Sequence, residues 1–225
     1  TYAPSDARTS SPLATVKTTL GRCGEESTLG VAAFRSVGIP ARQVYTPRWA
    51  HTDDNHAWVE VWIDGKWHFL GACEPEPIID MAWFNGPAAR GMLMATNAFG
   101  KYDGPEQQLY SDSCFTRINV TSNYAPVHKS SVQVLNPDGT PAAGAEVSFR
   151  LYNYAEFFPL FTTRADADGR ASLECGKGNL IVWARNDNGD LNYAVAGPDD
   201  EELTLPLLDN EAFKASMPRE MTVRP

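Results

Sequence analysis

A β-hairpin at residues 56–70 is the feature that most constrains how this chain can fold. In its first half, polar or aromatic side chains alternate with aliphatic ones, and this two-residue period is typical of a strand. Asp64-Gly65 is a strong two-residue turn sequence, and the residues after it return as the partner strand. The turn pairs Ile63 with Lys66 and thereby sets the register of the whole hairpin.

A helix is expected over residues 24–37, before the hairpin. Its apolar residues recur mostly at spacings of three and four, which places them on one stripe. They are Leu29, Ala32, Ala33, Phe34 and Val37. Gly38 and Pro40 end this helix, and a short strand is expected at residues 41–45.

Two other segments of the first half carry weaker patterns. Residues 1–20 contain Pro4 and Pro12, so we expect an extended or loosely ordered lead-in there. Residues 78–104 mix large apolar side chains with several glycines, and we expect an irregular segment that covers the hairpin.

Cys23 and His56 are the residues best placed for chemistry. Cys23 lies at the start of the expected helix, where unpaired N–H groups lower the pKa of a thiol. His56 opens a strand, and histidine is suited to move protons for a thiol that attacks an amide carbonyl. Taken singly, Cys23 is better explained as a small buried residue, and His56 is equally well explained as a surface or packing residue. Cys73 is a weaker nucleophile because it precedes Glu-Pro-Glu-Pro rather than a helix.

Two sequence blocks resemble the transglutaminase-like cysteine enzymes. Gly-Ile-Pro-Ala-Arg at residues 38–42 resembles the strand entry after the family's nucleophile helix, and His-Ala-Trp-Val-Glu-Val at residues 56–61 resembles its histidine strand. The resemblance covers about residues 21–80 and implies a papain-like α+β core. It also implies that Cys23 is the nucleophile and that His56 is the general base and acid.

The third catalytic residue departs from the family pattern. The family usually places an aspartate four residues after the hairpin tryptophan, and that position is Gly71 here. Glu74 is the nearest carboxylate that precedes a proline, and we predict that it orients His56. The hairpin register places the Glu74 side chain on the face of the sheet opposite to His56, unless a bulge intervenes or the strand ends before Glu74. Asn55 is the second choice for this role, and Asp80 is the third.

The second half of the chain is strand-like throughout. Short alternating segments recur about every ten residues with Gly-containing turns between them, which is typical of a small β-sandwich. Its turn and strand-entry sequences resemble Ig-like or carboxypeptidase-regulatory-like accessory modules. We therefore predict an α+β transglutaminase-like domain over residues 1–125, a small all-β Ig-like sandwich over 126–209, and a linker or tail over 210–225.

Composition excludes some classes of partner and cofactor. The formal net charge is −9, which argues against nucleic acid because phosphate binding needs a basic surface. The sequence contains no run of 18 apolar residues, so no segment of it is expected to span a membrane. No cofactor is expected.

Metal binding is not expected either. The spacings of the four cysteines fit no zinc pattern. His51, Asp53, Asp54 and His56 fit no strong metal template. The Asp166-to-Gly169 segment is explained by a turn rather than by calcium.

These features predict acyl transfer on a peptide or protein amide through a thioester at Cys23. Hydrolysis by a peptidase or amidase is preferred, because no device for excluding water is evident. The alternatives are an inactive binding scaffold, transamidation or deamidation of protein glutamine, and a purely structural module. We expect an exported bacterial protein, of which this chain is a piece, with room for further domains of the same chain.

Overall fold

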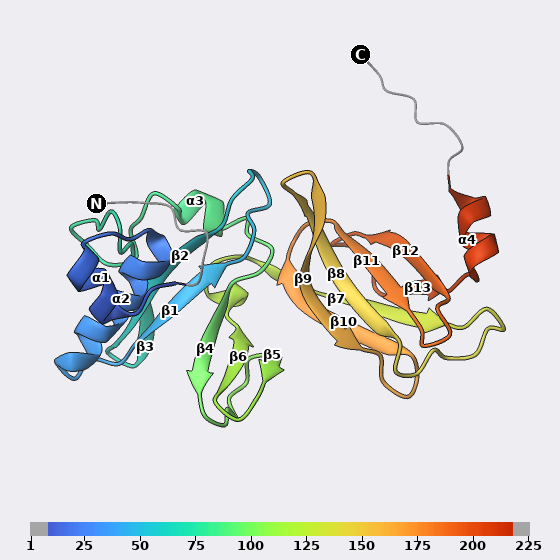
Figure 1. Cartoon of the computed structure of the whole chain (residues 1–225), viewed down its shortest axis with the longest axis horizontal. Helices are drawn as coiled ribbons and strands as arrows, with labels where there is room; N and C mark the ends of the chain where they lie inside the picture. The colour runs from blue at the N-terminus through green and yellow to red at the C-terminus, as the bar shows by residue number, and fades with distance from the viewer. Residues whose placement is uncertain (1–8, 218–225) are drawn as a thin grey trace, which may run out of the picture. The chain divides into compact units, whose positions relative to one another are not determined.

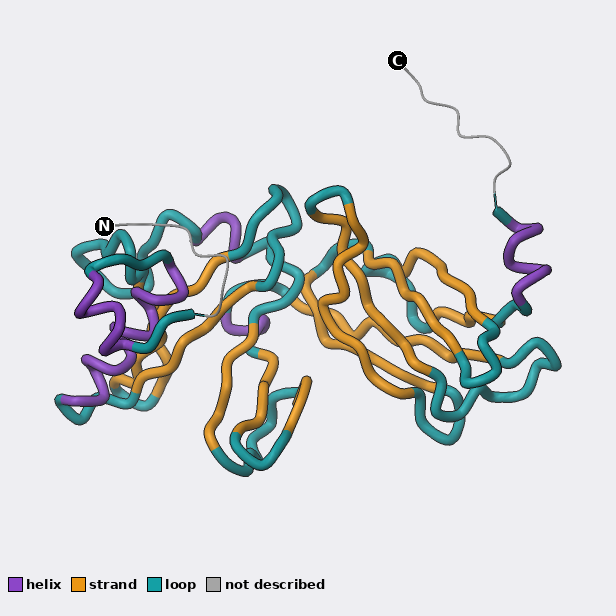
Figure 2. Tube along the Cα trace, viewed as in Figure 1, coloured by secondary structure: helices purple, strands orange, loops and turns teal. Residues whose placement is uncertain are grey.

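The computed structural model describes residues 9–217 of the 225-residue chain. The chain divides into two compact units, and the first ends at Val127 while the second begins at His128 (Figure 1). The first unit combines helices with a sheet, and the second is built almost entirely of strands (Figure 2). The α+β fold followed by a largely all-β region is therefore confirmed.

Two helices open the first unit. α1 covers Pro12–Thr18 and α2 covers Cys23–Ser36. Ser11 caps α1 by accepting the Ala14 N–H on its side chain, and a proline suits the first helical position. The expected extended lead-in is therefore wrong for residues 12–18, where this cap begins a helix. Residues 1–8 lie outside the described part of the chain.

A six-stranded sheet in the order β3-β2-β1-β4-β6-β5 follows the helices. Its strands are β1 (Ala41–Thr46), β2 (His56–Ile63), β3 (Lys66–Leu70), β4 (Ala95–Phe99), β5 (Gln108–Ser111) and β6 (Phe115–Asn119). A short helix α3 (Asn85–Ala88) and a 3₁₀ turn η1 (Thr121–Asn123) complete the unit. The segment expected to be irregular, residues 78–104, thus contains α3 and the whole of β4.

The hairpin of β2 and β3 has the predicted register. Ile63 pairs with Lys66, and the ladder continues to Val59 opposite Leu70. Asp64 and Gly65 both have positive φ, 49° and 82°. Positive φ at both central residues matches the right-handed twist of the flanking strands.

β2 is buried on both faces and separates two apolar cores. On one face Trp58 packs with Trp49, Phe84 and Met94. On the other face Val59 and its neighbours pack against the apolar side of α2, through residues that include Val31 and Phe34. The side chains of β2 therefore alternate between the two cores, as the sequence pattern predicts.

A buried polar network crosses the Trp58 face of β2. Arg42 Nε donates to Glu60 Oε2 at 2.5 Å, and the Tyr124 hydroxyl donates to Glu60 Oε1 at 2.5 Å. Trp58 Nε1 donates to the Tyr124 oxygen at 2.8 Å. Burial and the Glu60 carboxylate hold the pKa of Tyr124 far above its usual value, so this phenol remains a donor.

The second unit contains two sheets, with strand orders β10-β7-β13 and β12-β11-β8-β9. The strands are β7 (Val127–Leu135), β8 (Glu146–Asn153), β9 (Glu156–Arg164), β10 (Arg170–Gly176), β11 (Leu180–Arg185), β12 (Leu191–Ala196) and β13 (Leu203–Pro206). Both sheets contribute fully buried side chains, such as Val134 and Leu173 from one and Phe149 and Val182 from the other. A short helix, α4 (Asn210–Ser216), begins the segment predicted as a tail, and residues 218–225 lie outside the described part.

Replacing Tyr124 by phenylalanine should destabilise the first unit by about 1–3 kcal/mol, because Trp58 Nε1 and Glu60 each lose a buried partner. Denaturant unfolding followed by tryptophan fluorescence would measure this, since five of the six tryptophans lie in the first unit. Tyr110→Phe is the control because that side chain is half exposed, and it should change stability by less than about 0.5 kcal/mol. Equal effects of the two variants would contradict the buried network.

Candidate active site

A cavity of about 640 Å³ contains the residues singled out for chemistry. It is lined by the start of α2, the loop before β2, the start of β2 and the segments after β3 that carry Cys73, Glu74 and Trp83. The lining residues are Arg22, Cys23, Trp49, His51, Thr52, Asp53, Asp54, Asn55, His56, Cys73, Glu74 and Trp83. Cys23, His56 and Glu74, which are far apart in sequence, thus share one cavity.

Cys23 is the first residue of α2 and is 8% exposed. The helix start is fixed by Glu25, whose carboxylate accepts the N–H groups of Arg22 and Ser10 at 3.1 and 3.2 Å. The N–H groups of Gly24 and Ala57 are directed at the Cys23 sulfur. Since Ala57 follows His56 in β2, this contact brings the thiol to the strand end that carries the imidazole.

Burial decides the protonation state of Cys23. It raises the pKa of the thiol above the ordinary value of 9.0, although the two N–H groups and the Arg22 charge act in the opposite direction. The Asp54 carboxylate adds to the increase. The expectation that the helix start gives a depressed thiol pKa is therefore wrong, because desolvation of the charged form outweighs the dipole.

His56 lies among aromatic rings and is 7% exposed. Its ring centroid is 4.9 Å from that of Trp83 and 5.2 Å from that of Phe84. Its Nε2 is buried and has no hydrogen-bond partner among the described residues. A buried polar atom without a partner is costly, and such atoms are found where a substrate or a reacting group supplies the partner.

The pKa of His56 is lowered below 6.5, mainly by burial. The carboxylates of Glu74 and Asp54 oppose this change because they stabilise the imidazolium. At neutral pH the pair is therefore a neutral thiol and a neutral imidazole. The imidazole is then ready to accept a proton.

Glu74 was predicted to reach His56 only if the hairpin contains a bulge or if the strand ends before residue 74, and the second condition is met. β3 ends at Leu70, so the hairpin register no longer dictates the direction of Glu74. A close turn follows, since a Cβ on Gly71 would lie 3.1 Å from the Glu74 carbonyl oxygen. Glu74 is exposed and acts on His56 through its charge. Its role as the residue that orients His56 stays a prediction.

The two other choices for that role differ in position. Asn55 lines the same cavity, and its backbone N–H donates to the Asp54 carboxylate at 2.8 Å. Asp80 Oδ2 lies 2.6 Å from His68 Nδ1, and Asp80 Oδ1 accepts the Phe69 N–H at 3.0 Å. Asp80 is therefore engaged by β3 and lies outside the lining of the cavity.

Asp54 is the residue that sequence reasoning missed. It was considered only for a metal, yet its charge acts on both Cys23 and His56. Its position two residues before His56 was the available signal. The Trp49 N–H donates to its carbonyl at 2.9 Å, and this bond closes the loop before β2.

Cys73 shares the cavity but is less suited to attack. Burial raises the pKa of its thiol, and the nearby Glu26 carboxylate raises it further. All four cysteines are free thiols. Between residues 9 and 217, no group of three or more His, Cys, Asp or Glu is arranged to hold a metal, and no helix there is long and apolar enough to cross a membrane.

Comparison with known families agrees with this geometry. Residues 1–72 match the transglutaminase-like superfamily. The match includes Cys23 and His56 and ends before Cys73 and Glu74. No curated protein gives a significant match to the chain.

Replacing Glu74 by glutamine should lower the pKa of His56 further, because the imidazolium loses a stabilising negative charge. NMR titration of the histidine side chains would measure the change. Glu76→Gln is the matched control, since Glu76 is also an exposed carboxylate that precedes a proline but does not line the cavity. A shift of the same size in both variants, or none in Glu74→Gln, would contradict the assignment of Glu74 to this site.

Proposed function

We propose that the first unit is a cysteine-dependent acyl transferase that hydrolyses amide bonds of peptides or proteins. One observation carries the proposal. The Ala57 N–H is directed at the Cys23 sulfur, and the neighbouring residue, His56, is buried with no hydrogen-bond partner for its Nε2 among the described residues. The superfamily match over both residues supports the same chemistry. Glu74 is the proposed orienting residue.

The first step forms a thioester. Cys23 Sγ attacks the amide carbonyl carbon while its proton passes to His56. A thiolate and an imidazolium therefore need not exist before the attack. The carbonyl oxygen gains negative charge, which the positive end of the α2 dipole at Cys23 is suited to stabilise. When the carbon–nitrogen bond breaks, the amine leaves with the proton that His56 held.

The second step releases the acyl group. His56 accepts a proton from water as the water oxygen attacks the thioester carbonyl carbon. The carbon–sulfur bond then breaks, and the proton returns to the Cys23 sulfur. The products are a carboxylic acid and the free thiol, so the cycle requires no cofactor. Attack by an amine in place of water would give transamidation.

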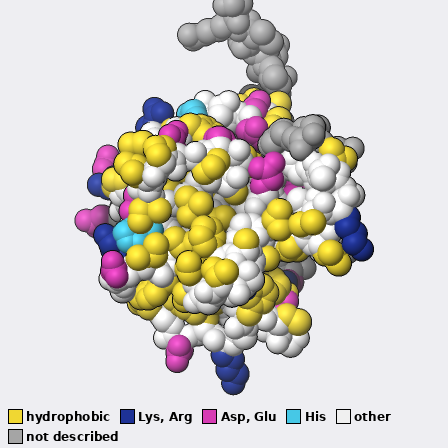
Figure 3. Space-filling view, turned by 90° about the vertical axis from the view of Figure 1, so that its left-hand side faces the viewer, with side chains coloured by type: hydrophobic (Ala, Val, Ile, Leu, Met, Phe, Trp, Pro, Cys, Tyr) yellow, Lys and Arg dark blue, Asp and Glu magenta, His cyan; other side chains and the backbone are white. Residues whose placement is uncertain are grey.

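Charge and shape of the cavity indicate what substrate it accepts. In the described part of the chain, Asp53, Asp54 and Glu74 line it, together with one arginine, Arg22. This excess of carboxylates favours a peptide with positive charge near the bond that is cleaved. Trp83 is half exposed at the cavity and offers an apolar contact to the peptide. Figure 3 shows hydrophobic side chains spread widely over one face of the first unit.

The second unit is proposed as an accessory module. Its two sheets have the strand content of an Ig-like sandwich, and such modules accompany exported enzymes. We propose an exported location for the chain on this basis.

Acylation of the protein by an activated ester tests the proposal. After treatment with p-nitrophenyl acetate, intact-mass analysis should show an acetyl group on Cys23 that water or hydroxylamine removes. The group should be absent in Cys23→Ala, and His56→Ala should slow its formation by about 10²- to 10⁴-fold. Cys114→Ala is the control because that thiol is exposed and outside the cavity.

Two outcomes would separate the alternatives. Acylation at Cys23 that proceeds equally fast without His56 would support the inactive scaffold. An acyl-enzyme that transfers to an added amine in preference to water would replace hydrolysis by transamidation.

A further inference from the structure

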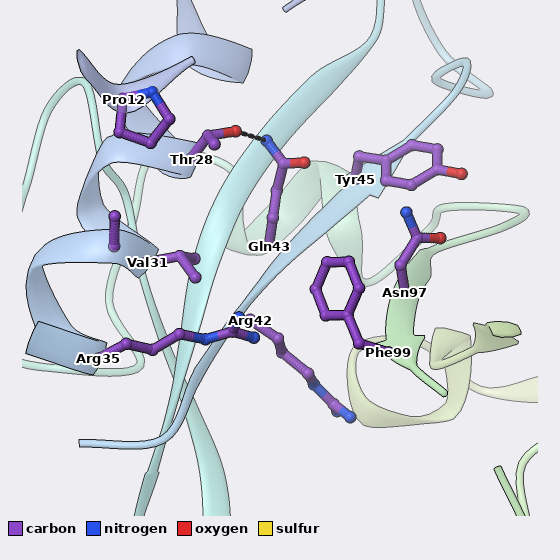
Figure 4. A pocket seen from close by; sticks show the side chains of 10 residues that line it. Pro12, Thr28, Val31, Arg35, Arg42, Gln43, Tyr45, Asn97 and Phe99 are labelled. Atoms are coloured by element: carbon purple, nitrogen blue, oxygen red, sulfur yellow. Dashed lines mark hydrogen bonds between the residues drawn. The ribbon is translucent and has the colours of Figure 1, made fainter. Parts of the chain in front are cut away.

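A second cavity lies where β1 and β4 separate. The two strands pair only at Val44 with Thr96 and at Tyr45 with Ala95. Beyond these pairs they diverge and leave a space of about 310 Å³ bounded by α2. In Figure 4, Arg35 reaches in from α2 on one side and Phe99 stands on the other, with β1 between them.

This cavity is distinct from the one that holds Cys23, since no lining residue is common to both. Arg35 lies twelve residues after Cys23 on α2, which corresponds to about 18 Å along the helix axis. A ligand here would therefore not contact the reactive pair.

Two arginines, Arg35 and Arg42, line the second cavity, and Arg117 lies beside it against the lining residues Asn97 and Tyr45. Arg35 Nε donates to the Ala41 carbonyl at 2.8 Å, and Arg42 Nε donates to Glu60. Arg117 Nε donates to Asn97 Oδ1 at 3.3 Å. In the part of the chain that the structure describes, no terminal guanidinium nitrogen of these arginines has a hydrogen-bond partner.

Arg42 holds one buried nitrogen without a hydrogen-bond partner among the described residues. The residue is 9% exposed, and its Nη2 is buried without a partner. Its guanidinium bonds Glu60 and lies 3.9 Å from the Trp67 ring, on the face of the sheet opposite α2. The terminal nitrogens of Arg35 are therefore the ones that can hold a ligand in the second cavity.

The local charge is opposite to that of the whole protein. Among the described residues, no aspartate or glutamate lines this cavity, and Glu60 is the one carboxylate bonded to its lining arginines. The chain as a whole has a net charge of −9. A concentrated positive site on an acidic protein favours an anionic ligand.

The rest of the lining is apolar or neutral. Val31, Ala32, Tyr45 and Phe99 supply carbon surface, and Gln43 is fixed by donating to the Thr28 hydroxyl at 3.1 Å (Figure 4). Phe99 also lies under the Arg35 guanidinium at 5.6 Å. A purely inorganic anion would leave this surface without contact.

We infer that the second cavity binds a small organic carboxylate of about the size of one acylated amino acid. The carboxylate would accept two parallel bonds from the terminal nitrogens of an arginine, which match its geometry. The apolar part of the ligand would pack on Phe99 and Val31. A pocket of this size is at the lower end of those that hold small molecules.

Calorimetry with N-acetyl-phenylalanine and with its amide tests the inference on the full chain. The acid should bind and the amide should bind at least about tenfold more weakly, because only the acid carries the charge. Cys23→Ala should bind the acid as tightly as the wild type. Inorganic phosphate should bind more weakly than the acid.

Substitution of Arg35 locates the site. Arg35→Gln should weaken binding of the acid by about tenfold. Arg90→Gln is the matched control, since Arg90 is exposed and also donates its Nε to a backbone carbonyl, at 3.4 Å, but lies outside this cavity. It should bind as the wild type does.

Four results would overturn the inference. They are no binding of the acid, equal binding of acid and amide, tighter binding of inorganic phosphate, and loss of binding in Cys23→Ala. Equal affinity of Arg35→Gln and Arg90→Gln would also overturn it, provided that circular dichroism shows both variants to be folded. Since acylation at Cys23 is measured separately, failure here leaves the proposed activity intact.

Discussion

Burial of strand β2 on both faces is the constraint on which the first unit depends. One face supports the core around Trp58, and the other supports α2. Because β2 is held this firmly, its first residue, His56, and the Ala57 N–H are fixed in place. α2 packs against the same strand and brings Cys23 to that N–H. The reactive pair is thus a consequence of how the helix and the hairpin bury their apolar sides.

The same burial determines the chemistry. Desolvation raises the pKa of Cys23 and lowers that of His56, so both effects favour the uncharged pair. A neutral pair attacks with proton transfer in the transition state, and the partnerless Nε2 of His56 is available for that proton. The carboxylates of Glu74 and Asp54 moderate the effect on the imidazole without reversing it.

The sequence predicted those parts of the structure that local chemistry controls. The hairpin register followed from Asp64-Gly65, and the helix from its apolar spacing. α1 and β4 were missed, because a single cap at Ser11 and packing against distant strands decide them. The thiol pKa was predicted in the wrong direction, since the helix start is visible in the sequence whereas the burial of Cys23 is a property of the fold. Asp54 was overlooked for the same reason.

Ionisation of Cys23 is the most direct test of this account. The ultraviolet absorbance of the thiolate, taken as the difference between wild type and Cys23→Ala, would be followed across pH. The account predicts that the thiolate forms only above the ordinary thiol pKa of 9.0. A thiolate already present at neutral pH, and lost in His56→Ala, would show a standing ion pair and contradict the neutral pair proposed for this site.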